Sequence, residues 1–502
     1  MNARLVALLR EALPDISWRR AVDVRRELVA GLTGALLVIP QAITFAYLAG
    51  VPPVYGLYCA VFVGFLSSLF GNSPMVGGPN TAVSILLGVT AIQFAGSGSP
   101  LYIEFVLILS LLVGLIQLVI WLLRGAVLFR YFSPAAIAGI KTGIGVILIT
   151  SALEGALGLS PLSTQLFYEK FYLAIVSWTE LVNPYAATIS AVTITSGLAL
   201  KKRWPRTYII AATLIGSLVG AAIYAVAGPL NSQVELLGHV TFQAIPLMVP
   251  RVGPQHWLFI EQAFPHAIAI AVLGLAQSLV ISRDLKASVA GDLDLHKEVF
   301  AQGVSNLLAP FFSTFAGSGS FNRTSVAVEM GARTPLSGMI AAGAVVLIAW
   351  ALGPFLTRLP MPAIAGVLAL VGIGMIQGRE LRPFRIEGAV FLVTLLSVLF
   401  LGLEVGIFVA ILASVVFFVA SVSKVDLAIS QDGDQERIVV GGNLYYASLD
   451  RLAKHLRSNP AARTVLDLSR VSYCDTSARE MIRKAQSERT LHGGQLEIAP
   501  TM

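Results

Sequence analysis

Charged side chains are scarce in this chain. Of its 502 residues only 13% are Asp, Glu, Lys or Arg, whereas 56% are hydrophobic. A soluble protein of this length needs more charge at its surface, so the composition predicts an α-helical polytopic membrane protein. We expect its location to be the cell (inner) membrane. The net charge of +7 comes largely from short loops between apolar runs. Such loops set membrane orientation, so this charge does not indicate a nucleic-acid partner.

Cysteine and the motifs of catalysis are also nearly absent. Cys59 lies in an apolar run and Cys474 in the polar tail, so they give neither a disulfide framework nor a metal cluster. The apolar runs contain no Ser/His/Asp set, no paired carboxylates and no H-E-x-x-H motif. Gly317-x-Gly319 is not followed by the Gly-Lys-Ser/Thr of a nucleotide loop. We therefore expect no enzymatic activity, no ATP hydrolysis, no cofactor and no metal.

What the chain has in abundance is apolar runs of spanning length. They lie at 28–50, 54–70, 101–123, 134–153, 181–200, 207–227, 264–282, 298–312, 335–353, 361–377, 384–401 and 403–422. Two shorter runs, at 80–95 and 321–331, are predicted half-spans. The total is about fourteen, which returns both termini to the same side of the membrane.

The loops between these runs differ in charge. If the N-terminus is cytoplasmic, the inside loops hold most of the basic residues: Arg124, Arg130, Lys201, Lys202, Arg203, Arg206, Arg283, Lys286, Lys297, Arg333, Arg379, Arg382 and Arg385. The outside loops hold only Lys170, Arg251 and Arg358. This asymmetry predicts that both termini are cytoplasmic. Lys141, inside the run 134–153, is interpreted as snorkelling to the inside end rather than as a functional residue.

The chain divides into three predicted parts. Residues 1–27 are expected to be a cytoplasmic leader, because no compact apolar segment with a small-residue cleavage site follows their arginines. Residues 28–423 form the transmembrane domain, and residues 424–502 a small cytoplasmic α/β domain. In that last part, predicted strands alternate with helices, at 426–430, 437–441, 446–458, 464–468, 476–491 and 495–498.

One stretch, Ser313 to Thr324, puts small and polar residues and an arginine at membrane depth. An arginine at the bilayer centre costs about 2.5–3.5 kcal/mol on insertion scales. Irregular backbone is tolerated there only where protein or water covers it. The short apolar run 326–330 indicates a half-helix that starts near Phe321. Because its N-terminus carries about half a positive charge, Arg323 opposes its own helix dipole unless an anion binds there.

A second stretch, Met75 to Ser84, resembles the first. It is also rich in glycine and continues with Asn80, Thr81 and a short apolar run. Paired interrupted segments at matching places in two halves of a chain indicate the binding site of a transporter. The alternative is that both stretches are ordinary loops between spans.

Ordered motifs along the chain resemble the SulP (sulfate permease) family of anion transporters, which carry a C-terminal STAS domain. They are the signature of the first two spans, the motifs of spans 3 and 10, and the core strand and phosphorylation loop of the STAS domain. These motifs lie at 37–46, 50–58, 78–84, 317–324 with 331–334, 465–469 and 474–477.

The resemblance implies a fold of two inverted repeats of seven spans, arranged as a core layer and a gate layer, with a cytoplasmic STAS domain. Spans 3 and 10 would start as extended segments whose half-helix N-termini meet near mid-membrane. The implied function is secondary active transport of a small anion, such as sulfate, bicarbonate or a dicarboxylate such as fumarate, by alternating access. Proton-coupled symport is one form, and an anion exchanger or an uncoupled anion channel is the alternative. Family members are commonly homodimers.

Carried over residue by residue, the resemblance implies a substrate site built from four spans. Its members are Gln41, Phe45, Asn80, Thr81, Gln277, Ser320, Phe321, Asn322 and Arg323. Arg323 would supply positive potential without needing to touch the anion. For Gln41 and Phe45 the alternative role is helix packing. Gln277 stands where many family members carry an acid, so no sodium site is expected around it.

Three further alternatives concern coupling, regulation and substrate. Proton coupling would need another group, for which Glu329 and Asp284 are candidates. Ser477 matches the phosphorylated serine of soluble STAS proteins, but we expect a structural role at a helix start. A nucleobase permease of similar architecture would favour acidic side chains, whereas Arg323 and Gln277 favour an anion.

Overall fold

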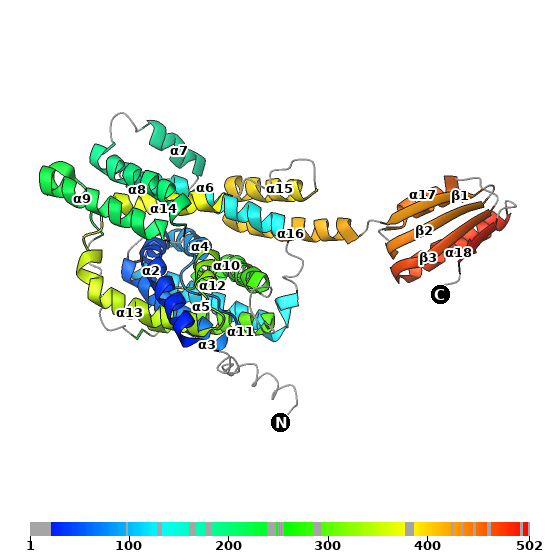
Figure 1. Cartoon of the computed structure of the whole chain (residues 1–502), viewed down its shortest axis with the longest axis horizontal. Coiled ribbons are helices and arrows are strands. Elements are labelled where there is room, and N and C mark those ends of the chain that lie inside the picture. The colour runs from blue at the N-terminus through cyan, green and yellow to red at the C-terminus, as the bar shows by residue number, and fades with distance from the viewer. Residues whose placement is uncertain are drawn as a thin grey trace, which may run out of the picture. The chain divides into compact units, whose positions relative to one another are not determined.

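The computed structural model describes most of the chain (Figure 1). The described residues are 22–96, 99–127, 133–159, 167–176, 182–205, 207–237, 247–248, 250, 253, 256–285, 293–376, 386–422, 425–432, 435–444, 448–458, 463–491 and 495–499. The chain forms two compact units, Met1–Ile411 and Leu412–Met502. Each unit is described by itself.

The first unit is helical. In the described residues, fourteen helices occupy the predicted spans: α2 (Val24–Leu48), α3 (Pro53–Phe70), α4 (Thr81–Ile92), α5 (Pro100–Leu122), α6 (Pro134–Leu157), α8 (Pro184–Arg203), α9 (Tyr208–Ser232), α10 (Trp257–Leu285), α11 (Leu295–Leu308), α12 (Phe321–Glu329), α13 (Leu336–Leu356), α14 (Met361–Met375), α15 (Ile386–Phe400) and α16 (Leu403–Val422), the last of which begins in the first unit and ends in the second. Seven of the described helices are long and apolar enough to cross a membrane. The predicted polytopic helical fold is confirmed. α7 (Phe167–Val176) was not predicted.

Helix starts in this unit follow capping chemistry. α5, α6 and α8 each begin at a proline preceded by Ser99, Ser133 or Asn183, whose side chain accepts a hydrogen bond from the first turn. Such a cap satisfies an amide that the helix leaves unpaired, and proline at the first position has no amide to satisfy. These signals fix helix boundaries that hydropathy alone leaves uncertain by about a turn.

The helices of the first unit pack in two groups (Figure 1). The core group comprises α2 to α5 and α10 to α13, and the gate group comprises α6, α8, α9, α14 and α15. Between the groups, α2 packs against α9 and α14. Both half-helices, α4 with 12 residues and α12 with 9, belong to the core group. A ligand held by the half-helices is therefore held by the core group.

The packing repeats between the two halves of the chain. α5 packs against α10 and α11, as α13 packs against α2 and α3. α4 packs against α10, as α12 packs against α2, and α8 packs against α14, as α15 packs against α6. Exchanging the two halves leaves these pairings unchanged, as expected of repeated halves in a transporter.

α6 and α14 cross within the gate group. The sequence Ile137-Ala138-Gly139 near the start of α6 recurs as Ile364-Ala365-Gly366 in α14, and the same offset relates Gly145 to Gly372. A Cβ added to Gly145 would lie 2.7 Å from the Gly372 carbonyl oxygen, and one added to Gly372 would lie 2.7 Å from the Gly145 carbonyl oxygen. This reciprocal contact places a local two-fold relation at the crossing.

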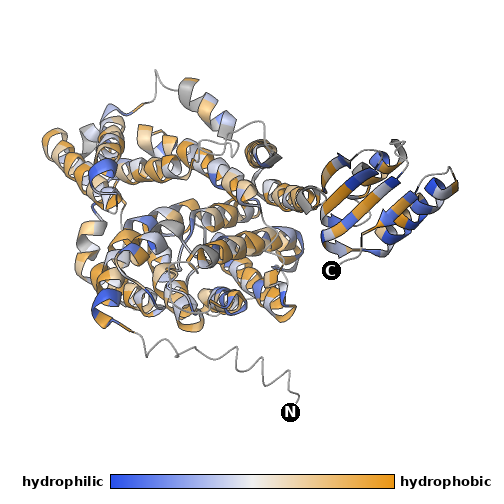
Figure 2. Cartoon of the chain, turned by 45° about the vertical axis from the view of Figure 1, so that its right-hand side comes forward, coloured by the Kyte–Doolittle hydropathy of each residue, from blue (hydrophilic) through white to orange (hydrophobic). Residues whose placement is uncertain are grey.

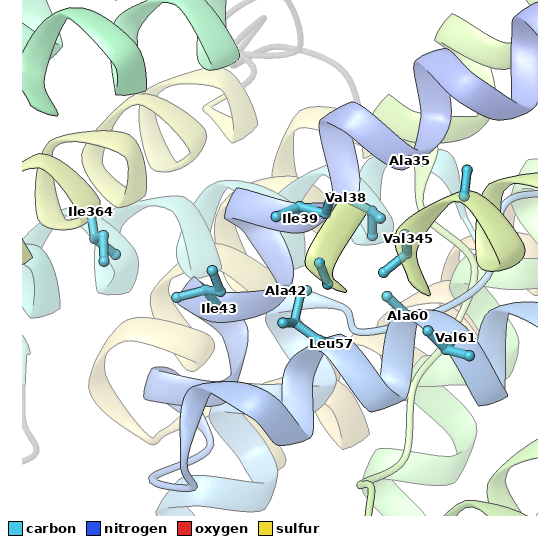
Figure 3. Packing of buried hydrophobic residues seen from close by; sticks show 12 residues of the cluster. Ala35, Val38, Ile39, Ala42, Ile43, Leu57, Ala60, Val61, Val345 and Ile364 are labelled. Atoms are coloured by element: carbon cyan, nitrogen blue, oxygen red, sulfur yellow. The ribbon is translucent and has the colours of Figure 1, made fainter. Parts of the chain in front are cut away.

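Apolar packing fixes α2 against its neighbours (Figure 3). Ala42 of α2 lies in one buried cluster with Leu57 of α3 and Val345 of α13. The cluster also includes Ile43 of α2 and Ile364 of α14, so it reaches the gate group. This contact lies near the start of α14, at the end opposite to the predicted cytoplasmic side.

The second unit contains a small α/β domain. Its four-stranded sheet has β1 (Asp426–Asp432) antiparallel to β2 (Gln435–Leu444), with β3 (Arg463–Cys474) and β4 (Gln495–Ile498) parallel to β2 in that order. α17 (Asp450–Ser458) and α18 (Thr476–Leu491) complete it. Figure 2 shows hydrophobic residues along most helices of the first unit and more hydrophilic residues in the second. The predicted α/β domain is confirmed.

Candidate functional site

The two half-helices begin where two extended segments meet. Residues 72–80 lead into α4, and residues 313–320 lead into α12. The Ser318 amide donates to the Gly78 carbonyl oxygen at 3.0 Å, and the Ser320 amide donates to the Val76 carbonyl oxygen at 3.3 Å. Gly78 has a φ of +124°, which side chains rarely allow. Glycine therefore permits the crossing of the two backbones.

Polar side chains of the core group hold the second segment. Asn306 of α11 accepts from the Gly317 amide at 2.8 Å, and its amide nitrogen donates to the Gly317 carbonyl at 3.0 Å and to Gln117 Oε1 at 2.8 Å. Ser110 and Ser278 accept hydrogen bonds from neighbouring amides of the segment at 2.9 and 3.0 Å. Irregular backbone at membrane depth needs partners of this kind, so the scaffold makes the extended segment possible.

The N-termini of α4 and α12 are tied together by one side chain. Asn80 Oδ1 accepts from the Ala82 amide at 3.0 Å, which caps α4, and Asn80 Nδ2 donates to the Gly319 carbonyl at 3.0 Å. Ser320 occupies the cap position of α12, and its side chain makes no capping bond. Each N-terminus carries about half a positive charge. The two half-helices thus direct positive dipole ends toward the same place.

Arg323 lies fully buried in the first turn of α12, with 0% of its surface exposed. Its Nη1 donates to Gln41 Oε1 at 3.3 Å. Its Nη2 donates to the Pro79 and Gly77 carbonyl oxygens at 3.0 and 3.4 Å. These acceptors are neutral, so they leave the guanidinium charge in place. The result is a fixed positive charge beside two helix N-termini, an arrangement that favours an anion.

A cavity of about 290 Å³ opens at these N-termini. Its wall combines amides, hydroxyls, one lysine and apolar groups, from both the core and the gate group: Gln41, Phe45, Asn80, Thr81, Gln277, Ser320, Ser325, Lys141, Val371, Gly374 and Met375. Ligand pockets are usually about 300–1,000 Å³, so this cavity suits a small ion with a few waters. Hydroxyl and amide donors make charge-assisted hydrogen bonds to such an anion.

The cavity brings together six of the nine predicted site residues: Gln41, Phe45, Asn80, Thr81, Gln277 and Ser320. Arg323 lies behind this wall and contacts it through Gln41. The side chains of Phe321 and Asn322 lie outside the described part of the chain. Gln277 Oε1 accepts from the Ser318 hydroxyl at 3.4 Å, which also links it to the second extended segment.

The gate-group part of the wall was not predicted. Lys141 was expected to snorkel to the inside end of α6, but the structure places it half-buried on the cavity wall. The signal was available, because an ionisable residue inside a span commonly marks a functional path. Val371, Gly374 and Met375 carry no such signal, because the face of α14 that meets the core depends on how the two groups pack.

Comparison with known proteins identifies the family. Residues 24–396 match the sequence profile of the sulfate permease family. The chain is 26% identical to the putative sulfate transporter YvdB of Bacillus subtilis (strain 168), over 94% of this chain and 91% of that protein. Its fold resembles the murine Slc26a9 anion transporter in the inward-facing state, with a TM-score of 0.81 and 20% identity over 99% and 89% of the two chains.

The transmembrane domain of a cyanobacterial bicarbonate transporter, BicA, is also similar, with a TM-score of 0.67 and 19% identity over 78% of this chain and 97% of that domain. The C-terminal α/β unit fits the STAS domain that the sequence predicted. The chain therefore belongs to the sulfate permease family, and it is an anion transporter rather than an enzyme.

Proposed function

We propose that this protein moves a small anion across the cell (inner) membrane by alternating access, and that the anion binds in the cavity at the N-termini of α4 and α12. The candidates are sulfate, bicarbonate and a dicarboxylate such as fumarate. The observation that carries the proposal is the convergence of two half-helix N-termini beside Arg323, whose charge is met by neutral oxygens. Such a site attracts an anion and excludes a cation.

The residues of the cavity wall have different roles in binding the anion. Ser320 and Thr81 offer hydroxyl donors at the two helix starts. Gln41 accepts from Arg323 through Oε1, which leaves its amide nitrogen as a donor for the anion. Arg323 is thus a positioning residue for Gln41 and a source of potential, and it does not contact the substrate. Phe45 limits the size of the site with an apolar surface.

The two helix groups supply the moving parts. The core group holds the half-helices through the hydrogen bonds of Asn306, Ser110 and Ser278, so it moves as one body with the anion. The gate group provides the surface against which it moves. We also propose that both termini are cytoplasmic and that the protein works as a homodimer, as the loop charges and the family resemblance suggest.

Coupling has two candidate forms. One is symport, in which a proton enters with the anion. Among the described residues that line the cavity, none carries a carboxylate, and Gln277 occupies the α10 position on the wall. This observation favours a second form, exchange of one anion for another, and speaks against a sodium site.

Uptake by purified full-length protein in liposomes tests the proposal. Radiolabelled sulfate, bicarbonate, fumarate and chloride are offered with and without an inward proton gradient, and with and without an internal counter-anion. We expect saturable uptake of at least one of them. Stimulation by protons indicates symport, and stimulation only by the counter-anion indicates exchange. Absence of protein-dependent uptake for all four anions would contradict the proposal.

A further inference from the structure

The inverted repeat relates residues on opposite halves of the membrane. In the core group, one constant offset aligns the two glycine-rich segments, pairing Gly77 with Gly317, Asn80 with Ser320 and Ser84 with Thr324. In the gate group, another constant offset pairs Gly145 with Gly372 at the helix crossing. Residues of these four segments therefore have identifiable counterparts on the other half.

Both cationic residues near the cavity, Arg323 and Lys141, have apolar counterparts. In the core group, Arg323 corresponds to Val83. In the gate group, Lys141 corresponds to Leu368, and each is the eighth residue of its helix. α12 leads into the loop that holds Arg333, and α6 follows the loop that holds Arg124 and Arg130, so both cations lie on the half predicted to be cytoplasmic. Their apolar counterparts lie on the other half.

Among the described gate-group residues, those near the cavity differ in exposure between the two halves of the membrane. Lys141 and Met375 line the cavity and are half-buried. Their counterparts, Leu368 and Leu148, are 2% and 0% exposed. On that opposite half, Ile364 and Ile43 join core and gate in one apolar cluster (Figure 3). The cavity thus gives access to the site from the predicted cytoplasmic side.

Lys141 and Arg323 belong to different groups of helices. Arg323 travels with the half-helices of the core group, whereas Lys141 stays on α6 of the gate group. When the core moves so that the site opens to the other half, the gate presents Leu368 where it had presented Lys141. Through this movement the anion keeps its partners in the core group. Its gate-group neighbour changes from Lys141 to Leu368.

We propose that Lys141 makes the substrate site electrostatically one-sided. It strengthens binding of an anion, and of a divalent anion most, while the site faces the predicted cytoplasmic side. It contributes little when the site faces the other side. This inference rests on the proposed function and assigns the specificity of the cytoplasmic-facing site to a gate-group side chain. Coulomb attraction scales with the charge of the anion, so a dianion gains about twice what a monoanion gains from the same lysine.

Sided transport measurements test the inference. Inside-out and right-side-out membrane vesicles containing the full chain are supplied with radiolabelled sulfate, and the KM for initial uptake is measured from each side. We expect Lys141→Gln to raise the KM from the cytoplasmic side about tenfold and the KM from the other side less than about twofold. Lys141→Arg should keep the wild-type sidedness, since it keeps the charge.

Lys202→Gln is the matched control. It removes the same charge from an exposed lysine in the last turn of α8, on the same predicted side but away from the cavity wall. We expect it to leave both KM values within about twofold of wild type, because an exposed charge is screened. An effect equal to that of Lys141→Gln would assign the sidedness to surface potential and overturn the inference.

Two further outcomes would overturn it. One is an equal change, or no change, in the two KM values of Lys141→Gln. The other uses the wild-type protein alone and is independent of whether the variant folds: the ratio of the KM for chloride to that for sulfate should be several-fold larger from the cytoplasmic side, and equal ratios contradict the proposal. Wild-type vesicles that transport none of the anions would instead contradict the proposed function itself.

Discussion

The core and gate groups share the repeated architecture, but their central crossings are built differently: the core group crosses two extended segments, and the gate group crosses two helices. In the core group, two extended segments cross at membrane depth. The side chains of Asn306, Ser110 and Ser278 accept hydrogen bonds from backbone amides of the second segment. In the gate group, α6 and α14 are continuous helices that meet backbone to backbone at Gly145 and Gly372. A continuous helix satisfies its own amides, so the gate crossing needs no polar scaffold.

The two kinds of contact suit the two helix groups to different roles. A hydrogen-bonded scaffold is directional, and it fixes the positions of the helix N-termini that face the cavity. A crossing of small residues is held by close van der Waals packing, which has little directional preference. The core group is therefore suited to carry the site without deforming it, and the gate group is suited to provide a surface for sliding or rocking.

In the core group, substitution of Arg323 is expected to have the largest effect on transport. Arg323→Glu would set a carboxylate against the Gly77, Pro79 and Gln41 oxygens and reverse the local potential. We expect it to abolish anion uptake in liposomes, a loss of at least about a hundredfold. Arg323→Lys keeps the charge and should retain part of the activity. Wild-type uptake by Arg323→Glu, in protein that elutes as a folded species on gel filtration, would refute the assigned role.

Asn306 tests whether the polar scaffold stabilises the core. Asn306→Ala leaves the Gly317 amide, the Gly317 carbonyl and Gln117 without this partner in a buried site. We expect a loss of about 2–4 kcal/mol of stability, seen as a lower unfolding temperature of the purified protein. Thr195→Ala is a suitable control, because the exposed Thr195 hydroxyl bonds only within its own helix in the described contacts. Equal unfolding temperatures for the two variants would contradict the scaffold role.

Gly145 tests the gate crossing. A methyl group at this position meets the Gly372 carbonyl oxygen at 2.7 Å, so Gly145→Ala forces α6 and α14 apart. Overpacking of this kind costs about 1–3 kcal/mol, and we expect the maximal transport rate to fall about tenfold while the KM changes less. Gly343→Ala in α13, where nothing lies within 4 Å of the added methyl, should behave as wild type. A KM effect without a rate effect would place the crossing in the binding site instead.

The half-helices and much of their site could be predicted from the sequence because glycine-rich segments inside apolar chain leave few structural choices. Five cavity residues lie in the family motifs, and Gln277 followed from a position at which many family members carry an acid. The gate wall could not be found in the same way, because a uniformly apolar helix such as α14 does not reveal which face meets a partner. Lys141 was interpreted only as a snorkelling residue because its place near a helix end is compatible with that role. The three-dimensional packing places it on the cavity wall as well.

Removal of the C-terminal α/β domain should have the smallest effect on transport by the core and gate groups. The residues that line the cavity all belong to the first unit. Truncation after residue 423 is therefore expected to lower the yield or the rate of transport, and to leave the ratio of sulfate to chloride uptake within about twofold of the full-length value. A changed substrate profile in the truncated protein would show that the STAS domain influences the site.

Direct localisation of a bound anion decides whether the half-helix N-termini form the substrate site. Crystals of the full chain grown with selenate, a heavier analogue of sulfate, would reveal the anion by its anomalous scattering. We predict a peak inside the cavity, between Asn80, Thr81 and Ser320, under conditions in which selenate competes with sulfate uptake. A peak elsewhere, with no anomalous signal in the cavity under those conditions, would contradict the assignment of the site.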